Sequence, residues 1–387
     1  MKRKPPQPSA RSAIEPFIVM DVMRAAADRE HAGERVIHME VGQPGAPAPR
    51  AVVEAAHAAL ADGQLGYTEA LGNRRLRSRI AAHYAEAHRI EVPMERIAIT
   101  TGSSGGFNLA FLAAFDVGDR IAVATPGYPA YRNLANALGL ETIEIPVNAD
   151  TGYTLTPAML EAAHAENPLA GLLVASPANP TGTIMTPAAL KALIAAAEDL
   201  GIVFISDEIY HRLIYAGTAA TTLEFSNDAI VVNSFSKYYC MTGWRIGWAV
   251  LPDGLVRAVE RIAQNLCICA PTISQRAALA AFDASADLDV IRNSYAASRR
   301  LLLERLPAIG FEEIFPVDGA FYIYASVRRF ANDSVEFTSR MLAEAGVAAT
   351  PGPDFDRQRG HSFVRFSFAG TEADMDEGVD RLSHWLK

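Results

Sequence analysis

One lysine stands among hydroxyl and aromatic side chains, a setting unusual for a surface residue. Residues 234–247 read SFSKYYCMTGWRIG, so Lys237 follows Ser234 and Ser236 and precedes Arg245. A lysine normally keeps its ammonium group in water, whereas one whose surroundings lower its pKa can act as a nucleophile and as a base. The two serines and the arginine would be unexplained around a surface lysine. Lys237 is therefore a candidate functional residue.

A glycine-rich segment is a second candidate. Residues 100–110 read TTGSSGGFNLA and join a strand-like run to a helical pattern, with Ser103 and Ser104 at the junction. Amide groups at a helix N-terminus bind anions, and serine hydroxyls add donors. The segment lacks both the G-x-G-x-x-G spacing of dinucleotide sites and the Gly-Lys-Ser/Thr of a P-loop. Read alone, it is equally compatible with an ordinary strand-to-helix turn.

The same segment leaves a serine hydrolase open as an alternative. It matches the G-x-S-x-G motif of a nucleophile elbow through Gly102, Ser104 and Gly106. Such an enzyme needs a downstream acid and histidine, for which Asp318 and His361 are candidates. No HGGG-like oxyanion loop precedes the motif, and a hydrolase would leave the lysine unexplained.

Three further segments with polar or aromatic candidates follow strand-like runs. Asp207 comes directly after the apolar run IVFIS, and Tyr210 follows it in SDEIYH. An ionised carboxylate in such a place needs a partner, and a protonated heterocyclic nitrogen would supply one. Asn179 in PANPTG and Tyr128 in PGYPAY lie in proline- and glycine-containing turns, which are also ordinary turn chemistry.

The elements that must position these residues alternate along the chain. From about residue 95, short β-branched runs alternate with helical patterns at about 106–115 and 187–199, which predicts an α/β fold with a mostly parallel sheet covered on both faces. Ligands bind outside the carboxyl ends of such strands, where the candidate residues converge. The expected strands are 97–100, 121–125, 171–176, 202–207, 230–235 and 244–250.

The last hundred or so residues read as a second, smaller α+β domain. Long helices at about 272–307 precede strand-like runs, and a closing helix ends the pattern; the runs are 311–315, 319–325 and 361–369. We expect an N-terminal arm and helix at 1–45 that packs with this small domain. The large domain would span 46–275 and the small domain 276–387.

Composition narrows the class of protein. With 35 basic and 44 acidic residues in 387, the formal charge of −9 gives no support for a nucleic-acid or membrane partner. No apolar run is long enough for a membrane span or a signal peptide. The three cysteines lack metal-ligand spacing, so we expect buried free thiols and a cytoplasmic protein.

Taken together, the motifs resemble those of the class I/II aminotransferases, which are fold-type I pyridoxal-phosphate enzymes. The segments NPTG, DEIY, SFSK and MTGWRIG occur in the family's order, and the resemblance extends from Gly42 to Arg365. It implies a large domain with a seven-stranded, mostly parallel sheet between helices and a smaller α+β domain. It also implies a homodimer in which the active site is shared between subunits.

The resemblance assigns a role to most candidates. Lys237 would carry pyridoxal phosphate as a Schiff base and then move the substrate proton. Asp207 would pair with the pyridine nitrogen, so that the ring becomes an electron sink. Tyr210 and Asn179 would donate to the phenolate oxygen, and Tyr128 would stack on the ring.

The cofactor phosphate would be held by several donors of this chain. The resemblance assigns Ser103 and Ser104 at the helix N-terminus, Ser234 and Arg245 to this phosphate, with Ser236 as a neighbour. Tyr67, in LGYTEALG, matches a tyrosine that reaches the phosphate of the partner subunit.

The substrate would lie beside the cofactor. Arg365, in FVRFSFA, would bind its α-carboxylate, next to Gly42 and Asn179. Aspartate-using members often carry a lysine where this chain has Ser104, and Phe17 and Ile18 in the arm would suit apolar or aromatic side chains.

The expected activity is therefore a ping-pong transfer of an amino group from an L-amino acid to a 2-oxo acid such as 2-oxoglutarate or pyruvate. A carbon–sulfur lyase on the same fold would share the lysine, the aspartate and the arginine. A non-catalytic regulator usually brings an added DNA-binding domain, for which the chain has no room.

Overall fold

The computed structural model describes residues 6–387, and the first five residues of the expected arm lie outside this range. The central sheet is built from strands that were mostly expected. Its members are β2 (Ile97–Thr100), β3 (Arg120–Thr125), β4 (Glu141–Pro146), β5 (Gly171–Ala175), β6 (Val203–Asp207), β7 (Ile230–Ser234) and β8 (Gly247–Val250).

The order of these strands is β2-β8-β7-β6-β5-β3-β4. β8 runs antiparallel to both of its neighbours, and the other pairs are parallel. The prediction of a seven-stranded, mostly parallel sheet is confirmed. β4 was not anticipated, because its run ETIEIP contains two glutamates and a threonine and lies at a partly exposed edge.

The sheet packs against apolar side chains on both of its faces. Successive side chains of a strand point to opposite faces, so Leu173 and Ile205 enter one core while Leu172 and Phe204 enter the other. The first core packs against α4 (Gly102–Ala114), α5 (Pro129–Leu138) and α8 (Asp253–Leu266), and the second against α6 (Pro157–Glu166) and α7 (Pro187–Asp199). Burial on both faces explains the nearly continuous apolar strands.

Local sequence sets where several of these helices begin. Thr156 and Thr186 accept a hydrogen bond from the first turns of α6 and α7, and each is followed by a proline at the first helical position. The remaining helices are α1 (Ile18–His31), α2 (Arg50–Ala61), α3 (Arg74–His88), α9 (Thr272–Ala281), α10 (Ser285–Ala308), α11 (Ser334–Arg340) and α12 (Glu372–Trp385). Within residues 6–387, no helix combines the length and apolarity needed to cross a membrane.

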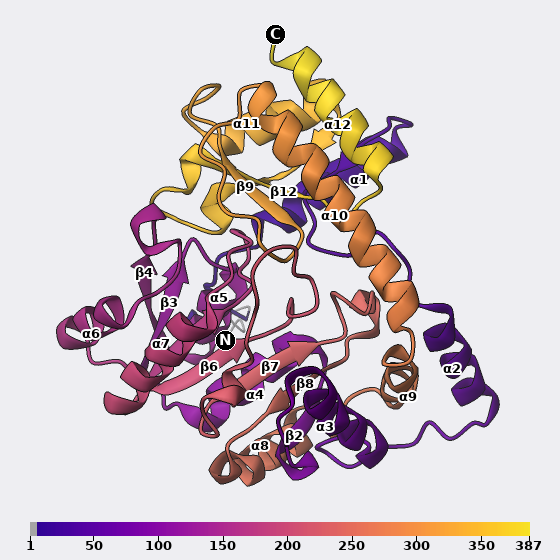
Figure 1. The fold of residues 1–387 in the computed structure, drawn as a ribbon, viewed down its shortest axis with the longest axis vertical. Helices are drawn as coiled ribbons and strands as arrows, with labels where there is room; N and C mark the ends of the chain where they lie inside the picture. Colours follow the sequence, from indigo (N-terminus) through magenta and orange to yellow (C-terminus); the bar gives the residue numbers. More distant parts are fainter. Residues whose placement is uncertain (1–5) are drawn as a thin grey trace, which may run out of the picture.

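A smaller antiparallel sheet lies at the other end of the molecule, where α10 runs beside α12 (Figure 1). Its order is β11 (Thr350–Pro351), β12 (Phe363–Ser367) and β9 (Tyr322–Ser326). The N-terminal segment joins this part of the chain, since β1 (Ile37–His38) pairs in parallel with β10 (Val347–Ala348) and α1 contacts β10 and β11.

Some expectations were wrong in detail. The run 311–315 is not a strand; it contacts β9 through an isolated bridge from Glu312 to Ser326 and a hydrogen bond from the Phe315 amide to the Tyr324 carbonyl at 3.0 Å. The helices expected at about 272–307 are present as α9 and α10, whereas α4 begins at Gly102 rather than near residue 106. All three cysteines are free, but only Cys240 is buried, whereas Cys267 is exposed and Cys269 is half-buried.

Candidate active site

A cavity of about 230 Å³ lies at the carboxyl edge of the central sheet and reaches the smaller sheet. Residues that follow β2, β3, β5, β6 and β7 meet there, because the carboxyl ends of parallel strands share one edge. The predicted site residues that line it are Gly42, Ser103, Ser104, Tyr128, Asn179, Asp207, Tyr210, Ser236, Lys237, Arg245 and Arg365.

The amine of Lys237 lies in the middle of this cavity wall. Its Nζ donates a hydrogen bond to the carbonyl oxygen of Gly42 at 2.5 Å and lies 5.9 Å from the ring centroids of Tyr210 and Phe321. Burial, with the positive charge of Arg365 as the next cause, lowers the pKa of this amine to about 8. The amine of Lys237 therefore loses its proton much closer to neutral pH than the amine of an ordinary lysine does.

Asp207 is buried at one end of the cavity. Its Oδ1 accepts from the amide of Ile209 at 3.1 Å, and its Oδ2 accepts from the hydroxyl of Tyr131 at 2.5 Å. Burial raises the pKa of Asp207 to about 6, and these two hydrogen bonds oppose the increase. Tyr131 was missed in the sequence, although it lies only three residues after Tyr128, and the two ring centroids are 5.3 Å apart.

Tyr210 and Asn179 each have a polar partner that the sequence did not reveal. The hydroxyl of Tyr210 lies 2.7 Å from that of Tyr322 on β9. Asn179 Oδ1 accepts from Arg365 Nη1 at 3.0 Å, which leaves its amide nitrogen as the available donor. A Cβ added to Gly42 would lie 2.1 Å from the Tyr322 hydroxyl oxygen, so only glycine fits there.

Arg365 is a buried cation without an anionic partner among residues 6–387. Its Nη2 donates to the carbonyl oxygen of Glu40 at 2.5 Å, and its guanidinium lies 4.4 Å from the ring centroid of Tyr322 and 4.7 Å from that of Phe355. Its Nε is buried and makes no hydrogen bond. A buried charge in this state is costly, so the site is suited to bind a carboxylate.

The opposite end of the cavity is an anion cradle. Ser103 and Ser104 lie in the first turn of α4, whose N-terminus has no side-chain cap. Gly102 has φ +70°, and a Cβ there would lie 2.4 Å from Arg245 Nη2, so glycine lets the guanidinium approach the helix terminus. Amide, hydroxyl and guanidinium donors in this arrangement suit a phosphate group.

Two candidate residues lie outside the cavity. Ser234 does not line it and Ser236 does; the Ser234 hydroxyl lies 2.9 Å from Ser236 Oγ and 3.2 Å from the carbonyl oxygen of Ile246, and its one hydrogen can be donated to either. Tyr67 is 81% exposed and does not line this cavity either.

The hydrolase alternative finds no geometric support. No histidine lines the cavity that contains Ser104. His361 is exposed instead, with its Nδ1 3.0 Å from Asp333 Oδ1, and Asp318 does not line the cavity.

The donor set fits pyridoxal phosphate. It offers an acid at one end, an amine of lowered pKa in the middle and an anion cradle at the other end, with Arg365 left for a carboxylate. This arrangement defines a pyridoxal-phosphate-dependent transferase of amino groups.

Comparison with known proteins gives the same result. The model of the family "Aminotransferase class I and II" matches residues 34–382, and the chain belongs to this family. It is 50% identical to the valine–pyruvate aminotransferase of Mycobacterium tuberculosis over 97% of both chains. A crystal structure of an aminotransferase from Mycobacterium tuberculosis matches with a TM-score of 0.96 and 49% identity, and the match covers 99% of both chains. The crystal structure of a putative aminotransferase from Silicibacter pomeroyi matches with a TM-score of 0.92 and 52% identity, over 98% of this chain and 99% of that one. The protein is a pyridoxal-phosphate-dependent aminotransferase that acts on amino acids and 2-oxo acids.

The lowered pKa of Lys237 can be measured on the protein without cofactor. We expect the rate of its acylation by an amine-specific reagent to rise with a midpoint near pH 8, because burial and the charge of Arg365 favour the neutral amine. Mass spectrometry of digests reads out the modified lysine, with the exposed Lys191 as a reference in the same sample. A midpoint near the ordinary value of 10.5 would contradict this description.

Tyr131→Phe tests the hydrogen bond to Asp207. Removing this donor raises the pKa of the carboxyl further, so we expect kcat to fall about tenfold and the Kd of pyridoxal phosphate to increase by a similar factor. Tyr239→Phe is the matched control, because the hydroxyl of Tyr239 is buried without a partner among the described residues. Equal effects of the two substitutions would exclude a specific role for Tyr131.

Proposed function

We propose that this aminotransferase moves the amino group of a branched aliphatic L-amino acid, with L-valine as the type substrate, to pyruvate. The observation that carries the proposal is that one cavity combines the guanidinium of Arg365, which has an unpaired nitrogen, with an apolar wall. The 50% identity to a valine–pyruvate aminotransferase supports it.

The apolar wall is formed by the arm and by two loops. It comprises Phe17, Val19, Met20, Val41 and Phe355. Ile18, which was expected to contribute, instead donates its amide to Asp354 Oδ1 at 3.0 Å and does not line the cavity. An aliphatic side chain placed against this wall gains free energy by leaving water.

A second substrate carboxylate has no partner in the same cavity. Its basic residues are Lys237, Arg245 and Arg365, and the proposed roles occupy all three. Asp354 is buried and contributes a carboxyl group of its own. Aspartate, glutamate and 2-oxoglutarate are therefore disfavoured, whereas the methyl group of pyruvate fits the wall.

The remaining residues would hold the cofactor and move a proton. Bound pyridoxal phosphate supplies the aldehyde that takes up the amino group and a ring that withdraws electrons. Asp207 would hold the ring nitrogen, Tyr210 and Asn179 would donate to the ring oxygen, and Tyr128 would pack on the ring. The phosphate would lie against the first turn of α4, Ser236 and Arg245. Lys237 would attach the cofactor and then carry the proton of the substrate Cα, for which a pKa near 8 is suited.

We also propose a homodimer in which Tyr67 completes the site of the partner subunit. Exposed apolar side chains occur on the segment that contains Tyr67 and on the segment that precedes Thr272. A hydrogen bond from Thr272 Oγ1 to the carbonyl oxygen of Gly66, at 2.7 Å, joins the two segments. The exposed apolar residues are Leu60, Leu65, Leu266 and Ile268. Exposed apolar groups of this kind favour a protein–protein interface. The three free cysteines favour a cytoplasmic location.

The division into an arm at 1–45, a large domain at 46–275 and a small domain at 276–387 remains part of this proposal. All strands of the central sheet fall between residues 97 and 250, and the smaller antiparallel sheet falls between 322 and 367, which supports it.

A panel of donors and acceptors tests the substrate proposal. We expect L-valine with pyruvate to exceed L-aspartate with 2-oxoglutarate in kcat/KM by at least about a hundredfold, because an unpaired second carboxylate loses several kcal/mol in a buried site. Release of pyruvate from a cysteine conjugate without any 2-oxo acid would instead indicate the lyase. A preference for L-aspartate would refute the proposal.

Hybrid dimers test the shared site. We expect Lys237→Ala and Tyr67→Ala each to lose most activity as pure proteins. When they are unfolded together and refolded as an equal mixture, about half of the dimers are hybrids with one intact site, so about a quarter of the wild-type activity should return. No return of activity would show that Tyr67 does not act across subunits.

A further inference from the structure

The segment from residue 35 to residue 42 brings two backbone carbonyls to the site. The carbonyl of Gly42 accepts from Lys237, and the carbonyl of Glu40 accepts from Arg365 Nη2 at 2.5 Å and from Thr350 Oγ1 at 2.8 Å. Arg365 has no carboxylate partner in the part of the chain that the structure describes, so these neutral acceptors orient its guanidinium. The position of the Glu40 carbonyl therefore affects how Arg365 meets a carboxylate.

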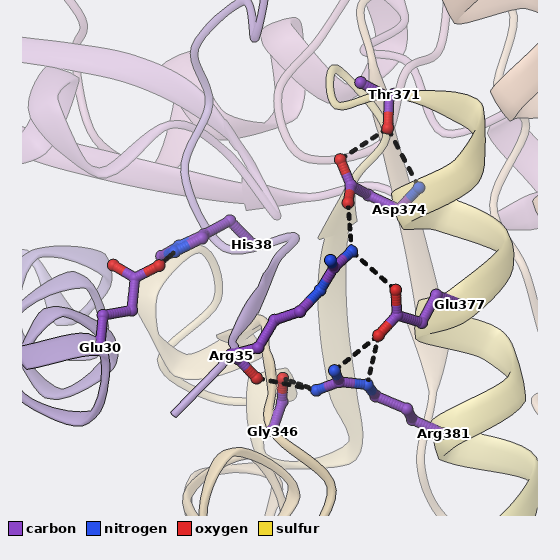
Figure 2. Close-up of polar contacts among 8 residues, drawn as sticks. All are labelled: Glu30, Arg35, His38, Gly346, Thr371, Asp374, Glu377 and Arg381. Carbon is purple, nitrogen blue, oxygen red and sulfur yellow. Dashed lines mark hydrogen bonds and ion pairs between the residues drawn. The ribbon is translucent and has the colours of Figure 1, made fainter. Parts of the chain in front are cut away.

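The side chain of the same residue is a buried carboxylate. Glu40 is 1% exposed, and its Oε1 lies 2.8 Å from Nδ1 of His38, while Oε2 is buried without a partner. On its other side, Nε2 of His38 lies 3.1 Å from Glu30 Oε1 on α1 (Figure 2). The bond to Glu40 is the main cause that raises the pKa of His38 to about 9, so the imidazole is protonated at neutral pH.

We infer that the His38–Glu40 ion pair is a positioning device for Arg365, which fixes the Glu40 carbonyl so that the guanidinium presents its free edge to the substrate α-carboxylate. The inference rests on the proposed role of Arg365. Neither residue lines the cavity, so both act through Arg365 and neither is catalytic.

The pair adds a constraint that the backbone alone does not provide. Backbone hydrogen bonds hold Met39, whose amide donates to Ala348 at 3.0 Å and whose carbonyl accepts from Ser367 at 2.6 Å. Among the described residues no backbone amide donates to the carbonyl of the next residue, Glu40, which is held by side chains alone. A buried carboxylate that loses its cation is strongly destabilised and would move toward water. That movement would carry the adjoining carbonyl away from Arg365.

A second anchor of the same segment offers a control. Arg35 contacts Asp374 Oδ1 at 3.1 Å and Glu377 Oε2 at 2.7 Å on α12, and Arg381 donates to the carbonyl oxygen of Arg35 at 2.9 Å (Figure 2). This anchor is largely exposed and does not touch Glu40. Glu377→Gln therefore loosens the segment at its surface end and leaves the buried pair intact.

The experiment compares Glu40→Gln, His38→Gln, the double variant and Glu377→Gln as purified holoenzymes. For Glu40→Gln and His38→Gln we expect both the KM for L-valine and the Ki of 3-methylbutanoate, a carboxylate without an amino group, to rise about tenfold. A hydrogen bond to a charged group contributes a binding free energy of this order. We expect kcat and the Kd of pyridoxal phosphate for the unloaded protein to change less than twofold. The double variant should be no worse than the singles, because they disrupt one interaction.

Each outcome decides between explanations. An unchanged KM in Glu40→Gln would overturn the inference, because backbone bonds would then suffice. A weaker affinity for pyridoxal phosphate in parallel with KM, or an equal effect in Glu377→Gln, would show general loosening and overturn it as well. If one single variant does not fold, the other and the double variant carry the same comparison. Arg365→Lys is the reference, since an unchanged KM there would refute the proposed role of Arg365 itself.

Discussion

The site depends on keeping two positive charges, Lys237 and Arg365, close together and largely out of water. Neither forms an ion pair with a carboxylate in residues 6–387, and the charge of Arg365 helps to lower the pKa of Lys237 to about 8. Carbonyl oxygens and aromatic rings offset part of the cost: Gly42 for the lysine, and Glu40, Tyr322 and Phe355 for the arginine. The remaining uncompensated positive charge makes the site suited to a carboxylate ligand.

Three parts of the chain must meet for this to happen. The parallel strands of the central sheet bring Asp207 and the lysine loop to one edge. β12 carries Arg365 across from the smaller sheet, and β1 leads into the segment that supplies the carbonyls. Because the Met39 carbonyl accepts from the amide of Ser367 on β12 while the Gly42 carbonyl accepts from Lys237, the N-terminal segment contacts both the smaller sheet and the lysine loop.

Residues with distinctive local motifs could be selected from the sequence, and residues that only contact a candidate residue could not. Asn179, Asp207, Lys237 and Arg245 lie in short segments with proline, glycine or hydroxyl neighbours, and the structure places all four around one cavity. Tyr131, Tyr322 and Glu40 resemble ordinary core or strand residues, and their contacts are made with distant segments. Ser234 and Ser236 are two residues apart with the same chemistry, so only the direction of the backbone decided which one faces the cavity.

The sequence by itself determined the class of fold and the chemistry at the ends of the strands. Strand–helix alternation and apolar periodicity are local properties, and they specify a covered, mostly parallel sheet whose carboxyl edge carries the functional groups. The tertiary structure alone decided the electrostatics of the site. The lowered pKa of Lys237, the unpaired guanidinium of Arg365 and the burial of Glu40 depend on distant segments that remove charges from water, because desolvation depends on everything packed around a group.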